Sequence, residues 1–139
     1  MSAPAVAVSR DGKKLAAAWM DERAGQGEKR VYWAIWSGAA PAEDAKIHAA
    51  GTRQDHPALA IDDAGTVWAA WEEGRSKERS IWVRSSPGDE PRRLSTAEDG
   101  IASFPAVAAG GGVVVVVYEG REEDGNKGEG RVVLRRWKG

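Results

Sequence analysis

The stretch Pro57-Ala-Leu-Ala-Ile-Asp-Asp-Ala-Gly-Thr-Val-Trp-Ala-Ala-Trp-Glu-Glu-Gly-Arg75 decides the fold of this 139-residue chain. It begins with a short apolar run after a proline, turns at Asp62 to Gly65, and continues with a second apolar run that ends at Trp71. Short runs that contain Val and Trp and are bounded by Gly or Asp turns favour strands over helices. The stretch therefore predicts two strands joined by a tight turn.

The same pattern occurs three times along the chain, with a period of about fifty residues. A Pro-Ala start is followed by a turn, an apolar run that ends in an aromatic residue, a polar loop and a third run. This period is typical of a β-propeller blade, which is a four-stranded antiparallel meander. The repeated starts are Pro4 to Val8, Pro57 to Ile61 and Pro105 to Ala109; the aromatic-ended runs are Leu15 to Trp19, Val67 to Trp71 and Val113 to Tyr118; the third runs are Arg30 to Trp36, Ser80 to Arg84 and Arg131 to Trp137.

A fourth, more polar strand is expected twice, around Lys46 to Ala49 and around Pro91 to Leu94, but not after Trp137. We therefore predict an all-β protein, a β-propeller of three four-stranded antiparallel blades of which the last lacks its outer strand. The blades span about residues 3–51, 55–99 and 103–139 of a single half-propeller domain, residues 1–139.

The second run of each repeat is apolar at successive positions, so both faces of these strands must be covered. Three blades leave two sheet faces open, and burying such apolar surface is favourable by roughly 25 cal/mol per Å². The simplest closure is a homodimer in which two half-rings complete a six-bladed ring through head-to-tail interfaces. The alternatives are a piece of a longer propeller and a partner half-ring of a different chain.

Composition limits the classes of function. The chain has 20 basic and 21 acidic residues and a net charge of −1, which predicts no binding to nucleic acid or to an anionic membrane. Cysteine is absent, which excludes disulfides, thiolate metal sites and cysteine nucleophiles. No apolar run approaches a membrane span, and the first four residues lack the regions of a signal peptide, so we expect a soluble chain with no signal peptide in this sequence; a removed leader, or a fragment that starts at a blade boundary, would look the same. His48 and His56 fall in different strands, and we expect no metal and no cofactor.

The segments Pro57 to Arg75 and Phe104 to Ala108 resemble the sialidase-like (neuraminidase-repeat) propellers of bacteria. The resemblance is a fold-level pattern over nearly the whole chain, and it implies a six-bladed ring and a secreted or periplasmic location. The Asp-box of this family is not met, because Ser9 to Gly12 has the wrong spacing. The family also uses three arginines, a Tyr–Glu nucleophile pair and an Asp; Tyr118 and Glu119 are adjacent on a strand, so their side chains diverge. Hydrolysis is therefore not expected.

Polar residues close the second run of each repeat and precede the first strand of the second repeat. The corresponding loops emerge on one face of a propeller, which is where the family's sites lie. Arginine beside acidic and aromatic residues can bind sugar hydroxyls or carboxylates, or it can form salt bridges between blades. The candidate ligand residues are Asp21, Arg23, Arg53, Asp55, His56, Glu73, Arg75, Glu119 and Arg121.

The sequence thus predicts a non-catalytic ligand-binding or scaffold propeller, with carbohydrate as the ligand class and a second copy as the partner. A self-assembling half-propeller without a ligand, natural or engineered, is the first alternative. A sialidase-like exo-glycosidase is the second.

Overall fold

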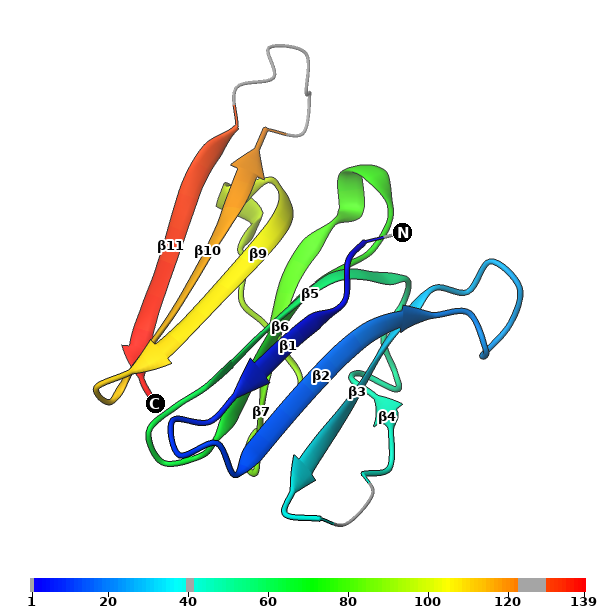
Figure 1. Cartoon of the computed structure of the whole chain (residues 1–139). Coiled ribbons are helices and arrows are strands. Elements are labelled where there is room, and N and C mark those ends of the chain that lie inside the picture. Colours follow the sequence, from blue (N-terminus) through cyan, green and yellow to red (C-terminus); the bar gives the residue numbers. More distant parts are fainter. Residues whose placement is uncertain (1, 40–41, 123–129) are drawn as a thin grey trace.

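The computed structural model describes residues 2–39, 42–122 and 130–139 (Figure 1). The described chain is all-β and forms three antiparallel sheets that follow one another in sequence, which confirms the predicted fold class at this level. The first sheet holds β1 (Ala5–Val8), β2 (Lys14–Asp21), β3 (Arg30–Ser37) and β4 (Ala45–Lys46); the second holds β5 (Gln54–Ile61), β6 (Val67–Glu73), β7 (Ser80–Ser86) and β8 (Arg92–Arg93); the third holds β9 (Ile101–Gly110), β10 (Val113–Arg121) and β11 (Arg131–Lys138), and the 3-10 helices are η1 (Ser76–Glu78) and η2 (Ala97–Asp99).

Each sheet is a meander whose strands pair in chain order, and the described part of the third sheet has three strands. β5 begins at Gln54 and β9 at Ile101, upstream of the prolines that the sequence pattern takes as strand starts. Proline has no N–H for the ladder and is therefore confined to edge strands, as β5 and β9 are in their sheets, or to bulges. The pairing of β5 with β6 accordingly shifts between Asp55 and Ala58, and the residue before the proline is left-handed, with φ 50° at His56 and 58° at Phe104.

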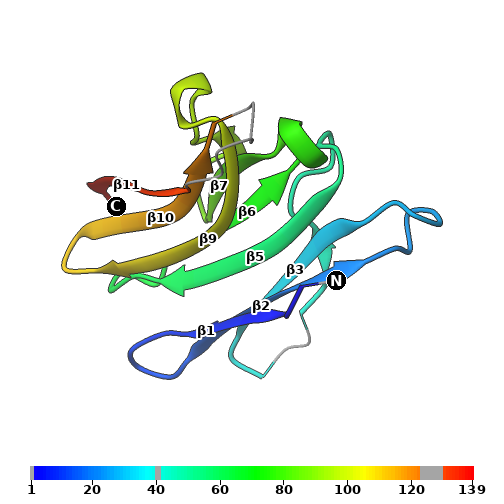
Figure 2. The ribbon, with the colours of Figure 1, turned by 90° about the horizontal axis from the view of Figure 1, so that it is seen from above.

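The three sheets lie side by side in chain order, and they do not close on one another (Figure 2). Their first strands are neighbours, since β1 contacts β5 and β5 contacts β9. The later strands of each meander lie successively farther from these first strands. The second sheet is therefore covered on both faces, whereas the first and third sheets are each covered on one.

Two apolar clusters fill the junctions between the sheets. β6 is buried at every residue because it contributes to both clusters, whereas β10 alternates between buried and half-buried positions. The prediction that both faces of this strand are covered is thus confirmed for the second sheet alone. The first cluster contains Ala16, Ala18, Val31, Trp33, Ile47, Val67, Ala69 and Trp71, and the second contains Ala70, Ile81, Val83, Ala102, Val116, Tyr118 and Val133.

A buried carboxylate fixes the connection between β8 and β9 against the third sheet. Asp99 is 4% exposed and accepts hydrogen bonds from the Tyr118 hydroxyl at 2.6 Å, from Arg135 Nη2 at 3.0 Å and from the Thr96 amide at 2.9 Å. Burial alone would raise the pKa of Asp99, but the bonds from Tyr118 and Thr96 and the charge of Arg135 outweigh it and hold this pKa below its ordinary value. Burial and the bond to Asp99 raise the pKa of Tyr118, so the phenol stays protonated.

Tyr118→Phe should lower the free energy of unfolding by about 2 kcal/mol, because the buried carboxylate loses a hydrogen bond that is assisted by its charge.

The folded-state pKa of Asp99 is depressed, so the stabilisation that Asp99 contributes is present above the ordinary aspartate pKa of about 3.9 and is lost as the pH falls through the lower folded value. Urea titrations from about pH 7 to about pH 3 should therefore show a steeper loss of stability for the wild type than for Asp99→Asn. Parallel pH profiles would contradict this role of Asp99.

Candidate functional site

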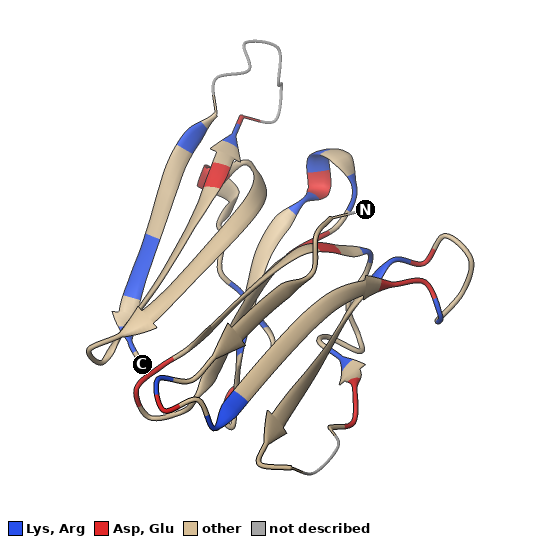
Figure 3. Ribbon diagram, viewed as in Figure 1, with Lys and Arg blue, Asp and Glu red and all other residues tan. Residues whose placement is uncertain are grey.

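The predicted ligand residues lie where β2, β6 and β10 end and where β5 begins, which is one end of the three sheets. Charged residues concentrate in the loops at the ends of the sheets, and most of the strand surface is uncharged (Figure 3). The structure does not gather the nine residues into one site, however. They form several separate contacts.

Asp21 and Arg23 form an ion pair within the first sheet. Arg23 Nη2 lies 2.6 Å from Asp21 Oδ2 and 3.0 Å from Asp44 Oδ2, and its guanidinium carbon lies 4.2 Å from the centre of the Tyr32 ring. The hydrogen bonds from the side chain and the amide of Arg23 hold the pKa of Asp21 below its ordinary value. This arginine is thus engaged by the strands and loop of its own sheet and does not form a salt bridge between sheets.

Asp55 and His56 join the first strands of neighbouring sheets. The His56 amide donates to Ser2 Oγ at 3.0 Å and to Asp55 Oδ1 at 2.8 Å. Burial alone would raise the pKa of Asp55, but its hydrogen bonds with Ser2 and with the His56 amide help to hold this pKa below its ordinary value. His56 Nδ1 lies 2.9 Å from Glu72 Oε2, without the angle of a hydrogen bond. Glu72 Oε2 accepts from the Phe104 amide at 2.8 Å, and the rings of His56 and Phe104 meet edge to face at 4.9 Å.

Glu73 belongs to a buried polar cluster that the repeat pattern of the sequence does not indicate. Its Oε1 contacts His48 Nδ1 and accepts hydrogen bonds from Trp71 Nε1 at 2.9 Å and from Gln54 Nε2 at 3.3 Å. Gln54 Oε1 in turn accepts from the Val31 amide at 2.9 Å, so the cluster connects the first sheet to the second. Glu73 is 5% exposed and Gln54 fully buried. This carboxylate is therefore a structural group and is not open to a ligand.

Gly51 lies so close to this cluster that there is no room for a side chain at this position. A Cβ there would lie 2.5 Å from Glu73 Oε1, 2.6 Å from Gln54 Nε2 and 2.7 Å from His48 Nδ1. A glycine placed between His48 and Gln54 in the sequence is a signal that could have indicated the cluster.

Gly51→Ala should lower the free energy of unfolding by about 2 kcal/mol, because the added methyl must displace hydrogen-bonded side chains that are already in contact. Gly110→Ala is the matched control, since a Cβ at Gly110 meets no atom within 4 Å. Chemical denaturation of both variants should separate them clearly. Equal stability of the two variants would refute the close packing around Gly51.

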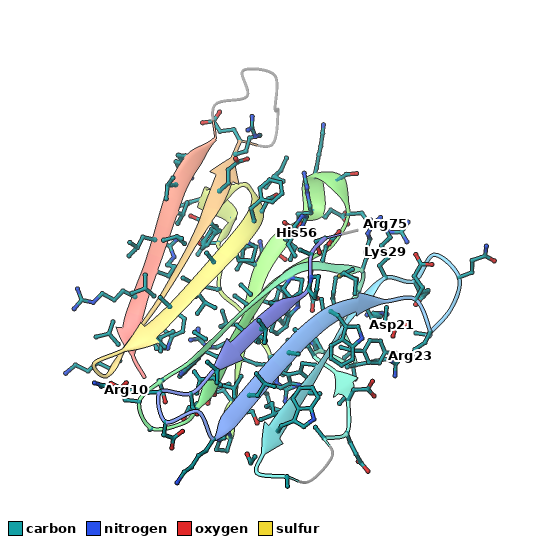
Figure 4. All side chains as sticks on the ribbon, viewed as in Figure 1. Arg10, Asp21, Arg23, Lys29, His56 and Arg75 are labelled. Carbon is teal, nitrogen blue, oxygen red and sulfur yellow. The ribbon has the colours of Figure 1, made fainter. Side chains whose placement is uncertain are left out.

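Arg53 and Arg75 line a pocket at the junction of the first and second sheets, together with Lys29 and Arg30. We call these four residues the cationic pocket; its volume is about 250 Å³. Figure 4 shows Lys29 and Arg75 at the same end of the molecule, opposite the end that carries Arg10. Lys29 was not among the predicted ligand residues, because it belongs to a loop that the repeat pattern leaves unassigned.

Glu119 and Arg121 lie at the uncovered face of the third sheet, where Arg121 Nη2 is 3.2 Å from Glu119 Oε1. Tyr118 points the other way, into the junction with the second sheet, where it is 2% exposed. The predicted divergence of the adjacent Tyr118 and Glu119 side chains is thus confirmed.

The turns at the opposite end of the first and second sheets line an open cleft of about 770 Å³. Across this cleft, Lys14 Nζ donates to the Gly65 carbonyl at 2.7 Å. Among the described residues no three side chains are grouped as metal ligands, and no helix is long and apolar enough to cross a bilayer.

A scan against protein-family models and a search of curated proteins both found no match for the chain.

Proposed function

We propose that this chain is a non-catalytic scaffold, one half of a six-bladed β-propeller that two copies complete by head-to-tail association. Each sheet then serves as one blade. The adjacent first strands β1, β5 and β9 support this proposal, because they lie where the inner strands of a propeller surround its axis.

The exposure of equivalent residues in successive sheets carries the proposal. Val133 pairs with Tyr118 as Trp82 pairs with Trp71, so Val132 and Leu134 correspond to Ile81 and Val83. Ile81 is fully buried and Val83 is 1% exposed, whereas Val132 is 82% and Leu134 56% exposed. The open face of the third sheet is therefore half of an interface that the chain already forms between its second and third sheets.

The open face of the first sheet supplies the other half. Leu15 corresponds in register to Val67 of the second sheet, which is fully buried against the first sheet, whereas Leu15 is 38% exposed. Val6 and Val8 on β1 are 69% and 60% exposed. The two open faces differ. The open face of the third sheet resembles the face of the second sheet that packs on the third, and the open face of the first sheet resembles the face of the second sheet that packs on the first. A second copy of this chain fits both faces, since contacts of this heterologous kind close into a ring when the rotation allows it.

A carboxylate on the open face points to the same docking. Glu72 of the second sheet accepts a hydrogen bond from the amide of Phe104, the residue before Pro105 of the next sheet. Glu119 occupies the corresponding position in the third sheet, and its side chain is 37% exposed. In the proposed ring its partner is the amide of Ala3, the residue before Pro4 of the second copy.

The side-chain contacts favour a scaffold over a hydrolase. The Tyr118 hydroxyl donates a hydrogen bond to the buried Asp99, and the raised pKa of Tyr118 is the opposite of what an attacking phenolate needs. Glu73 is enclosed by its hydrogen-bond donors.

Light scattering on the wild-type chain should give a mass of about 30 kDa, twice the 14.9 kDa of one chain. The double variant Val132→Lys/Leu134→Lys should give about half that mass with an unchanged far-ultraviolet circular dichroism spectrum, because both residues are exposed within one copy and charge opposes burial of the face. Glu90→Lys, an exposed change in the second sheet's β7–β8 connection, is the control and should remain dimeric.

A mixing experiment separates head-to-tail docking from docking of like faces. Val6→Lys/Leu15→Lys should also be monomeric, and an equimolar mixture of the two double variants should recover a mass near twice that of one chain, because one intact pair of faces remains. Monomeric wild-type protein at the highest soluble concentration would contradict the ring. A dimeric Val6→Lys/Leu15→Lys variant would contradict its head-to-tail geometry.

A further inference from the structure

The cationic pocket holds more positive charge than its surroundings neutralise. Lys29, Arg30, Arg53 and Arg75 line it together with a single carboxylate, that of Glu28. Arg30 is engaged, since its guanidinium donates to the carbonyls of Gly51 and Thr52 and lies 3.6 Å from Glu28. Within the described residues, the side chains of Lys29, Arg53 and Arg75 make no hydrogen bond and no ion pair.

These three unpaired cations are carried by a fixed backbone. The Lys29 carbonyl accepts from the Gln54 amide at 3.0 Å, the Arg53 carbonyl from the Gly74 amide at 2.9 Å, and the Arg75 carbonyl from the Glu78 amide at 2.9 Å. Lys29 and Arg53 are also half-buried. The loops of two sheets thus fix the backbone from which the three side chains extend toward one pocket, which reduces the ordering that a bound ligand would require.

The overall charge of the protein does not explain this cluster. The chain has a net charge of −1, so cations are not in excess, and most charged groups described above are paired with opposite charges. Like charges held close together repel one another, and half-burial reduces the screening by water. A bound anion would relieve this repulsion.

We propose that the cationic pocket binds a phosphate-type oxyanion, either free or as the monoester group of a larger ligand. Arginine presents a planar fork of N–H donors that matches the oxygens of such a group, and Thr52, which also lines the pocket, carries a hydroxyl donor. Three unpaired cations match a dianion better than a carboxylate, which carries one charge. The volume of about 250 Å³ is below the range of whole-ligand sites, about 300–1,000 Å³, and suits a single charged group. The site lies within one chain, so it does not depend on ring closure.

Isothermal titration calorimetry with inorganic phosphate, glucose 6-phosphate, glucose and acetate tests the site. Phosphate should bind with an affinity that falls as the salt concentration rises, and acetate should bind more weakly by about tenfold or more. Binding of both phosphate and glucose 6-phosphate, without glucose, assigns the recognition to the phosphate group in either form. Binding of inorganic phosphate alone identifies the free anion as the ligand. No binding of either phosphate compound at low salt overturns the proposal, as does equal binding of acetate.

Charge-removing variants locate the binding. Arg53→Gln and Arg75→Gln should each weaken phosphate binding about tenfold and should leave the unfolding midpoint in phosphate-free buffer unchanged, because neither side chain makes a hydrogen bond or ion pair within the described structure. Arg10→Gln is the matched control, since it removes the same charge from an exposed position at the opposite end of the sheets (Figure 4). An equal loss of affinity in Arg10→Gln would show a non-specific charge effect and overturn the assignment.

Discussion

The structure depends on the need to cover both faces of an apolar strand. β6 carries Val67, Trp68, Ala69, Ala70 and Trp71 in succession, and all of them are buried. A neighbouring sheet covers only one face of β6, so burial of both faces requires a sheet on each side. The chain supplies both. β2 and β10 each have a neighbouring sheet on one face alone, and the apolar residues on their other faces are half-buried or exposed.

Buried carboxylates add orientation to this apolar contact. Glu73 lies at the junction of the first and second sheets and Asp99 at the junction of the second and third, and both are almost fully enclosed by donors. A buried charge is tolerated only with its partners in place. Glu73 is bonded through Gln54 to the Val31 amide of the first sheet and so restricts how the first two sheets can slide against each other. Asp99 holds the connection that precedes β9 against Tyr118 and Arg135 of the third sheet. At both places an apolar cluster supplies buried area, and a carboxylate that accepts several hydrogen bonds favours one arrangement of the groups around it.

The repeat in the sequence was sufficient to predict the all-β class, the order of the strands and the three separate sheets, because these follow from local patterns of apolar residues, prolines and turns. The backbone before Pro57 and Pro105 was not predictable in this way, since the left-handed His56 and Phe104 appear only when the strand pairs through a bulge. Nor was the grouping of the candidate residues. His48 and Glu73 are 25 positions apart in sequence, and their contact results from the stacking of two sheets that local spacing does not encode.

The repeat also shows that fold and site are separate properties here. At both junctions the same backbone bond forms, from the Gln54 amide to Lys29 and from the Ala102 amide to Arg79. At the second junction, however, Ile101 stands where Arg53 stands at the first, and Arg79 Nε donates to the Ser76 carbonyl. The meander therefore creates the same position twice, and within the part of the chain that the structure describes Lys29 and Arg53 at the first junction have unpaired side chains, whereas at the second an apolar residue and a hydrogen-bonded arginine replace them. The unpaired charge is thus a property of the side chains at one junction, because the fold alone would have produced it at both.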